Sequence, residues 1–279
     1  MDYQWYPGHM TKARRMMQEN IALIDLLIEL TDARAPQSGR NPDIDSLAKG
    51  KSRIIVLNKA DLADPQATKA WREHFAEMGF FTSDIDSRKG SLTRGLKSLI
   101  DKACAEKIER NRRRGILNRP VRAMIAGIPN VGKSTFINSF AGRAAAKTGD
   151  KPGVTKGKQW IRLNKNVELL DTPGILWPKF DDQEIGKRLA LIGSIKDEIT
   201  DSGELAAWLI RYLNTEYPDV IENRYQVTEK KNVETVLSQI AVRRGCLKPG
   251  GVEDLEKASK LLIDDFRSGR LGSITLEKV

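Results

Sequence analysis

A chain of 279 residues, 40% of them hydrophobic and 30% charged, has the composition of a globular protein and can bury one large core or two ordinary ones. It has no apolar run of the roughly 18 residues that a membrane helix needs, and its N-terminus lacks the features of a secretory signal, so we expect a cytoplasmic protein without membrane association. The net charge of +10 comes from residues 1–178, with 31 Lys and Arg against 19 Asp and Glu, since residues 179–279 hold 16 against 18. Such a basic excess suggests a polyanionic partner, nucleic acid above all.

Strand and helix patterns alternate over the first part of the chain. Short apolar runs that end in polar residues predict buried parallel strands, and helical spacing predicts the helices between them. The expected strands are 25–30, 53–57, 80–85, 121–126, 158–163 and 167–170, and the expected helices are 65–78, 92–113 and one that begins at Lys133. This alternation predicts an α/β domain in which a mostly parallel sheet lies between two layers of helices.

The pattern changes after Pro178. Strand signals nearly vanish, and helical spacing appears at residues 183–196, 202–214, 232–245 and 253–267. We therefore predict two domains: an α/β domain at residues 1–178, which includes the N-terminal segment, and a smaller all-helical domain at residues 179–279.

Residues 127–134 read GIPNVGKS, which matches the pattern of a phosphate-binding P-loop between a strand and a helix. Gly127 and Gly132 allow the backbone to curl so that its N–H groups point at phosphate oxygens, and the helix start adds the positive end of its dipole. Lys133 supplies positive charge to the terminal phosphates and is also assigned to catalysis, while the Ser134 hydroxyl can ligate Mg²⁺. The residues of this loop predicted to bind nucleotide are Asn130, Val131, Gly132, Lys133, Ser134 and Thr135.

A second phosphate motif, Asp171-Thr172-Pro173-Gly174, ends an apolar strand further along the chain. An acid at a strand end can hold Mg²⁺, here Asp171, and the Gly174 N–H can contact the γ-phosphate. Between the two motifs lies Thr155, which can close over the γ-phosphate and complete the Mg²⁺ ligands. These residues predict Mg²⁺ as a cofactor.

Asn58-Lys59-Ala60-Asp61 follows the expected strand 53–57. An Asp61 carboxylate can accept hydrogen bonds from N1–H and the 2-amino group of guanine, a donor pair that adenine lacks, so adenine would leave the buried carboxylate unpaired. Lys59 can lay its stem along the base, and Asn58 can brace the loops. Together with the phosphate motifs, the four residues predict binding of GTP and GDP.

The base motif precedes the phosphate motifs in this chain, an order that resembles the circularly permuted P-loop GTPases. The order costs little physically, because the site needs only neighbouring strand ends. Where such proteins have their second base-contacting loop, this chain has DSRKG, which departs from the usual Ser-Ala-Lys form. Asp86 and Ser87 are expected to contact the base there, with backbone N–H groups near the guanine oxygen.

Further segments narrow the resemblance, namely WYPGHM at 5–10, TDARAP at 31–36, DTPGILWPKF and RRGCLKPGG. Together they resemble the bacterial ribosome biogenesis GTPase A family over essentially the whole chain. The resemblance implies assembly of the large ribosomal subunit, GTP hydrolysis stimulated by the nascent particle, and a helical domain that contacts rRNA. An Asn at the position of Asn130 ligates K⁺ in related cation-dependent GTPases, so K⁺ is a second expected cofactor.

The rRNA contact is assigned to Arg243, Arg244 and Lys248, although their domain is acidic overall. The alternatives are Lys12, Arg14, Arg15 and the basic run at 110–114, which lies in the densest basic stretch, 102–122. That stretch fits a polyanion-binding surface and a solvated helix face followed by a linker equally well.

Catalysis is assigned to His9, because Ile175 occupies the place where many GTPases carry a water-orienting Gln. A His titrates near neutrality and can position the attacking water once a partner orders its segment. The alternative is that WYPGHM only packs against the domain.

Three functions remain compatible with these motifs. The expected one is a monomeric, GTP-hydrolysing ribosome assembly factor. A nucleotide-gated RNA-binding module with negligible turnover is favoured by Ile175. A tRNA-modification or metabolic P-loop enzyme would need a further catalytic site, for which the sequence offers no motif.

Overall fold

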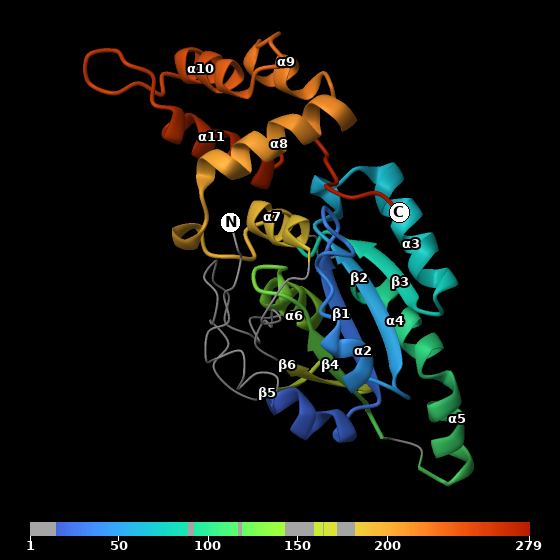
Figure 1. Ribbon diagram of the computed structural model, residues 1–279. Helices are drawn as coiled ribbons and strands as arrows, with labels where there is room; N and C mark the ends of the chain where they lie inside the picture. Colours follow the sequence, from blue (N-terminus) through green and yellow to red (C-terminus); the bar gives the residue numbers. More distant parts are fainter. Residues whose placement is uncertain (1–14, 89–91, 117–118, 143–158, 164, 172–181) are drawn as a thin grey trace.

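The computed structural model describes residues 15–88, 92–116, 119–142, 159–163, 165–171 and 182–279. Its centre is a six-stranded sheet in the order β3-β2-β1-β4-β6-β5 (Figure 1). The strands are β1 (Leu26–Asp32), β2 (Ser52–Asn58), β3 (Phe81–Ile85), β4 (Val121–Ala126), β5 (Gln159–Arg162) and β6 (Val167–Asp171). Neighbouring strands are parallel except β5 and β6, which are antiparallel. The predicted α/β class is confirmed.

Side chains of alternate strand residues point to opposite faces of the sheet. On one face Leu26 and Ile28 join the core formed with α4 and α6. On the other face Ile55 and Leu57 pack against Trp71 of α3, and α2 covers the neighbouring part of that face. Helices on both faces give the three predicted layers. These helices are α2 (Asp43–Leu47), α3 (Pro65–Glu77), α4 (Leu92–Ala103) and α6 (Lys133–Ala141).

The single helix predicted over residues 92–113 is two helices in the structure, α4 and α5 (Ala105–Arg113). Cys104 between them leaves helical backbone angles, with φ −107° and ψ 11°. Beyond Cys104, the Lys107 ammonium forms an ion pair with the buried Asp25 carboxylate. The α5 side chains, all within the described residues, are exposed or half-buried. The helix therefore breaks because α5 has no apolar stripe that continues the packing of α4.

Residues 182–279 are mainly helical and lie at one end of the sheet (Figure 1). Helix α7 ends at Leu191 rather than near residue 196, because Gly193 adopts a positive φ of 78°. A short helix, α9, is present that the sequence did not predict. The helices are α7 (Gln183–Leu191), α8 (Ser202–Glu216), α9 (Val220–Tyr225), α10 (Val233–Arg244) and α11 (Leu255–Arg267). The proposed boundary between residues 178 and 179 lies outside the described residues and stays a prediction.

Within the ranges that the structure describes, no helix combines the length and the apolar character needed to cross a bilayer. The last residues of the chain return to the α/β part beside α3 (Figure 1). The N–H groups of Ile274 and Leu276 donate to backbone carbonyls there. The Glu277 carboxylate accepts from the Ser38 N–H at 2.9 Å and from its hydroxyl at 2.6 Å. Burial raises the pKa of Glu277, although these hydrogen bonds oppose the shift.

Glu277→Ala should lower the free energy of unfolding by about 1–3 kcal/mol, because the buried Ser38 donors lose their acceptor. Urea unfolding followed by circular dichroism measures the loss. The control is Glu216→Ala, which removes the ion pair between the half-buried Glu216 and the exposed Lys278, worth at most about 1 kcal/mol. Equal losses in the two variants would contradict the anchoring role of Glu277.

Candidate functional site

The loop at residues 127–132 joins β4 to α6 at one end of the sheet. Gly127 lies so close to β1 that a Cβ there would collide with the Leu30 carbonyl oxygen. Gly132 has a φ of 95°, and a Cβ there would lie 2.5 Å from Nδ2 of Asn58. Both glycines are therefore needed for the loop to close against its neighbours.

The Lys133 ammonium group lies inside this loop. Lys133 begins α6 and is buried, and its Nζ donates to the carbonyl oxygens of Gly127 (3.0 Å) and Ile128 (2.8 Å). Ser134 and Thr135 follow in the first helical turn and are half-buried. The loop thus combines a positive charge with a helix N-terminus, the two features that bind phosphate groups.

Asn58, the last residue of β2, connects three loops. Its Nδ2 donates to the Val131 carbonyl of the phosphate-binding loop at 2.7 Å. Its Oδ1 accepts from the N–H (3.1 Å) and the hydroxyl (2.6 Å) of Ser87, which follows β3. Ser87 therefore braces Asn58 through both its N–H and its hydroxyl, whereas it was expected to contact the base.

Lys59 has a left-handed backbone conformation, with φ 57°, that directs its side chain along the phosphate-binding loop. Its Nζ donates to the Asn130 carbonyl at 2.9 Å and forms an ion pair with Asp32 at 3.0 Å. Burial lowers the pKa of Lys59, although the Asp32 charge opposes the shift. Burial also acts to raise the pKa of Asp32, but the Arg34 and Lys59 charges outweigh it and hold that pKa well below its usual range.

Asp61 and Asp86 lie on either side of one arginine. Asp61 is in the short 3₁₀ turn Ala60–Leu62 after β2 and is exposed, not buried as expected, and Asp86 follows β3. The Arg88 guanidinium pairs with both carboxylates, at 3.0 Å from Asp86. The structure thus brings together the two acids that the sequence assigned to the base.

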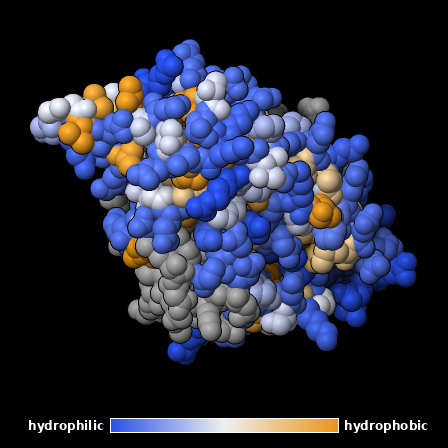
Figure 2. Space-filling view, turned by 45° about the horizontal axis from the view of Figure 1, so that its top comes forward, coloured by the Kyte–Doolittle hydropathy of each residue, from blue (hydrophilic) through white to orange (hydrophobic). Residues whose placement is uncertain are grey.

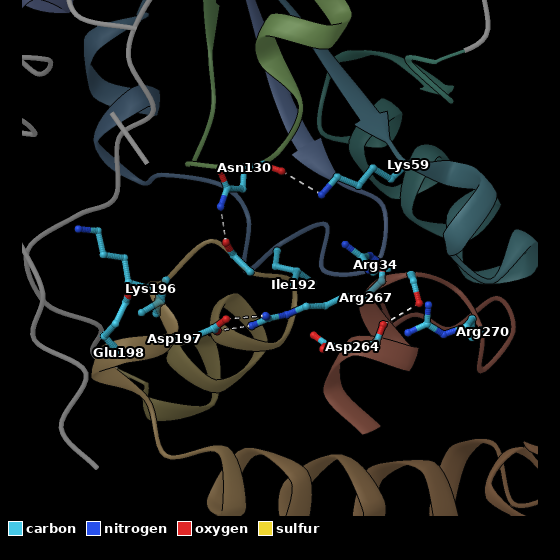
Figure 3. A pocket seen from close by; sticks show the side chains of 13 residues that line it. Arg34, Lys59, Asn130, Ile192, Lys196, Asp197, Glu198, Asp264, Arg267 and Arg270 are labelled. Atoms are coloured by element: carbon cyan, nitrogen blue, oxygen red, sulfur yellow. Dashed lines mark hydrogen bonds and ion pairs between the residues drawn. The ribbon is translucent and has the colours of Figure 1, made fainter. Parts of the chain in front are cut away.

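Asn130 has its carboxamide turned towards the helical part of the chain (Figure 3). Its Nδ2 donates to the Gly193 carbonyl, in the segment after α7, at 2.7 Å. Val131 is buried and takes part through its backbone carbonyl. A carboxamide oxygen is a suitable K⁺ ligand, so the residue type fits the expected ion.

The Mg²⁺ residues fall only partly within the described ranges. Asp171 ends β6, which pairs with β4, and the β4–α6 loop leads to Ser134. Hydroxyl and carboxylate oxygens from adjacent strand ends are ligands that Mg²⁺ accepts, so these residue types fit the ion. Thr155, Gly174 and His9 lie outside the described residues, as does the Asp171 side chain.

The basic residues assigned to rRNA lie at the far end of the helical part. Arg243 and Arg244 are in the last turn of α10, Lys248 follows, and all three are exposed. The Arg244 guanidinium also donates to the Arg224 carbonyl at 2.6 Å. Exposed Leu247 lies in the same segment, and Figure 2 shows orange residues among blue ones on the protruding tip at the upper left.

Two buried residues that support this site, Asp32 and Arg34, were not predicted as site residues from the sequence. Asp32 and Arg34 belong to the TDARAP segment, which was used only as a family marker. Arg34 pairs with Asp32 at 2.8 Å and donates to the Arg267 carbonyl at the end of α11 at 3.1 Å. The sequence signal that could have identified Asp32 is an acidic residue at the end of a buried strand, next to the strand that ends in the base motif.

Comparisons with known proteins agree with this geometry. The family described as 50S ribosome-binding GTPase matches residues 122–240. The Priestia megaterium protein named ribosome biogenesis GTPase A is 44% identical, over 99% of this chain and 97% of its own length. The Thermotoga maritima protein of that name is 33% identical, over 98% and 94%. The chain belongs to the ribosome biogenesis GTPase A family.

Two solved structures of the GTPase YlqF resemble the fold. A GDP-bound structure is 26% identical with a TM-score of 0.67, covering 95% of this chain and 99% of its own. A GNP-bound structure from Thermotoga maritima is 28% identical with a TM-score of 0.66, covering 96% and 98%. The predictions of a P-loop GTPase fold, of a GTPase that binds GTP and GDP, and of a magnesium-dependent nucleotide site are confirmed.

Asp61→Asn should weaken GTP binding and improve binding of xanthosine triphosphate, because a carboxamide offers a donor to the altered base edge. Titration of both nucleotides by fluorescence competition measures the change, and we expect each affinity to shift by at least about tenfold. Asp84→Asn is the control. Asp84 lies on the neighbouring strand β3, is exposed, and forms an ion pair with Arg72. An unchanged base preference in Asp61→Asn would remove Asp61 from the base site.

Proposed function

We propose that the protein is an assembly factor of the large ribosomal subunit, which binds rRNA in its GTP-bound state and hydrolyses GTP when the nascent particle stimulates it. The observation that carries the nucleotide-binding part of the proposal is the Asn58 carboxamide, which joins the base loop to the phosphate loop and the Ser87 loop. The relatives named for ribosome biogenesis support this choice of partner. We expect a monomer that acts in the cytoplasm.

Within this proposal each motif has one role. Asp61 recognises guanine, with Asp86 beside it, and Lys59 supports the base while its ammonium holds the phosphate loop. Lys133 neutralises the terminal phosphates. Ser134, Thr155 and Asp171 would hold Mg²⁺, which would supply further charge neutralisation, and the Gly174 N–H would contact the γ-phosphate. The Asn130 carboxamide would hold K⁺.

Stimulated turnover and rRNA contact are tested together. GTP hydrolysis should rise when purified large ribosomal subunits are added. Charge reversal, Arg243→Glu with Arg244→Glu, should reduce this stimulation because phosphate contacts are lost, and the defect should be largest at low salt, where those contacts contribute most. The control is Lys257→Glu with Lys260→Glu, which makes the same change in charge on the exposed side of α11.

Two outcomes would redirect the proposal. Subunit binding without any rise in turnover would support the nucleotide-gated RNA-binding module that Ile175 favours. Full stimulation in the Arg243–Arg244 variant would move the rRNA contact to Lys12, Arg14, Arg15 or residues 110–114.

His9→Ala should retain GTP affinity and lose subunit-stimulated turnover by about 10²-fold or more, the range of general acid–base catalysis. The reason is that Ile175 cannot orient water, so the group that does so must come from elsewhere. Nucleotide titration and turnover with and without large subunits measure the two effects. His74→Ala on α3 is the control. A wild-type stimulated rate in His9→Ala would leave WYPGHM a packing role only.

A further inference from the structure

The segment between α7 and the 3₁₀ turn Asp197–Ile199 makes two hydrogen bonds to consecutive residues of the phosphate-binding loop. The Ser194 hydroxyl donates to the Pro129 carbonyl at 2.9 Å, and Ser194 is 1% exposed. The Gly193 carbonyl accepts from Nδ2 of Asn130 at 2.7 Å. The helical part of the chain therefore contacts the nucleotide-binding loop directly.

The chemistry of the Gly193 contact determines which way the Asn130 carboxamide faces. A carbonyl oxygen can only accept a hydrogen bond, so it must meet the amide nitrogen of Asn130 and not its oxygen. The Oδ1 atom is then turned away from Gly193. That oxygen is the one atom of the side chain that can bind a cation. Hydrogen bonds of this kind fix the orientation of metal ligands.

The segment that makes these contacts is itself anchored to α11. Arg267, at the end of α11, donates to the carbonyls of Ala190 (2.8 Å) and Leu191 (3.0 Å) and pairs with Asp197 at 2.7 Å. Arg34 of the α/β part donates to the Arg267 carbonyl at 3.1 Å. A displacement of α11 would therefore move the segment that holds the phosphate-binding loop.

A polar cavity of about 870 Å³ borders these contacts (Figure 3). Lys59 and Asn130 line it from the α/β part, and Lys196 and Arg270 line it from the helical part. Gly193 also lines the cavity, and beside it the hydrogen bonds of Gly193 and Ser194 join the segment directly to the loop.

We propose that Gly193 and Ser194 are positioning residues, which orient the Asn130 carboxamide and thereby make cation-assisted GTP hydrolysis depend on the placement of the helical part. The inference rests on the proposed role of Asn130 as a K⁺ ligand. It assigns to the helical part a second role besides rRNA contact, since a partner that moves α11 would change the activity of the phosphate site.

Ser194→Ala tests the inference, with Ser259→Ala as the matched control. Ser259 is equally buried, and its hydroxyl also donates to a carbonyl, Leu255 O at 2.8 Å, but within α11. The readouts are the affinity for a fluorescent GDP–aluminium fluoride complex and the rate of GTP turnover, each in KCl and in NaCl. Affinity for GDP alone reports on the rest of the site.

The wild type should bind the complex more tightly, and turn over GTP faster, in KCl than in NaCl. We call the ratio of the KCl value to the NaCl value the potassium gain. In Ser194→Ala this ratio should be about tenfold smaller than in the wild type, the usual lower limit when an orienting partner of a metal ligand is removed. Its affinity for GDP in NaCl and its melting temperature should match those of Ser259→Ala. Combining Ser194→Ala with Asn130→Ala should cost no more potassium gain than Asn130→Ala alone, since both act through one side chain.

A full potassium gain in Ser194→Ala would overturn the positioning role and leave the cation site intact. Equal losses of affinity and of turnover in KCl and in NaCl would also overturn the positioning role, because they would indicate a general loosening of the loop. A wild type without any potassium gain would remove the Asn130 cation site and this inference together.

Discussion

The Asn58 carboxamide forms hydrogen bonds that join segments 29 and 73 residues away in the chain. Asn58 is 2% exposed, so water cannot replace a partner that is lost. An unsatisfied buried group of this kind costs about 1–3 kcal/mol. The base loop, the phosphate loop and the Ser87 loop are therefore held together by one side chain whose donor and acceptor are both used.

A buried ionic network supports that arrangement. The Asp32 carboxylate forms ion pairs with Arg34 and Lys59, and the Lys59 ammonium also donates a hydrogen bond to the Asn130 carbonyl. Burying charges is unfavourable unless they are paired, and removing one member of a buried pair costs about 3–5 kcal/mol. The network explains why Asp32 and Arg34 occur together at the end of β1. Through the Arg267 carbonyl, it also links the base motif to α11.

The helical part therefore does more than follow the α/β part in the chain. Its segment at Gly193 and Ser194 contacts the phosphate-binding loop, while Glu277 anchors the chain end to Ser38. These contacts lie at separate places on the α/β part. A buried attachment at Glu277, separate from the hydrogen bonds at Gly193 and Ser194, suits a part that must respond to a partner and remain attached.

The strands, the three layers and the nucleotide motifs could be predicted from the sequence, because they depend on local patterns such as apolar runs and the GIPNVGKS loop. The break at Cys104 was not predicted, since the sequence pattern was read as one helix, and only the folded chain shows that the α4 face packs into the core while the α5 side chains stay exposed or half-buried. The end of α7 depends on the positive φ of Gly193.

The candidate site divides in the same way. The sequence by itself predicted which residues would meet guanine and phosphate, because those assignments follow from residue type and spacing. Tertiary structure alone decided that Ser87 braces Asn58 and that Asn130 faces Gly193. A hydrogen bond needs a particular partner at a particular distance, and that partner is 63 residues away for Asn130. Only the folded chain brings the two together.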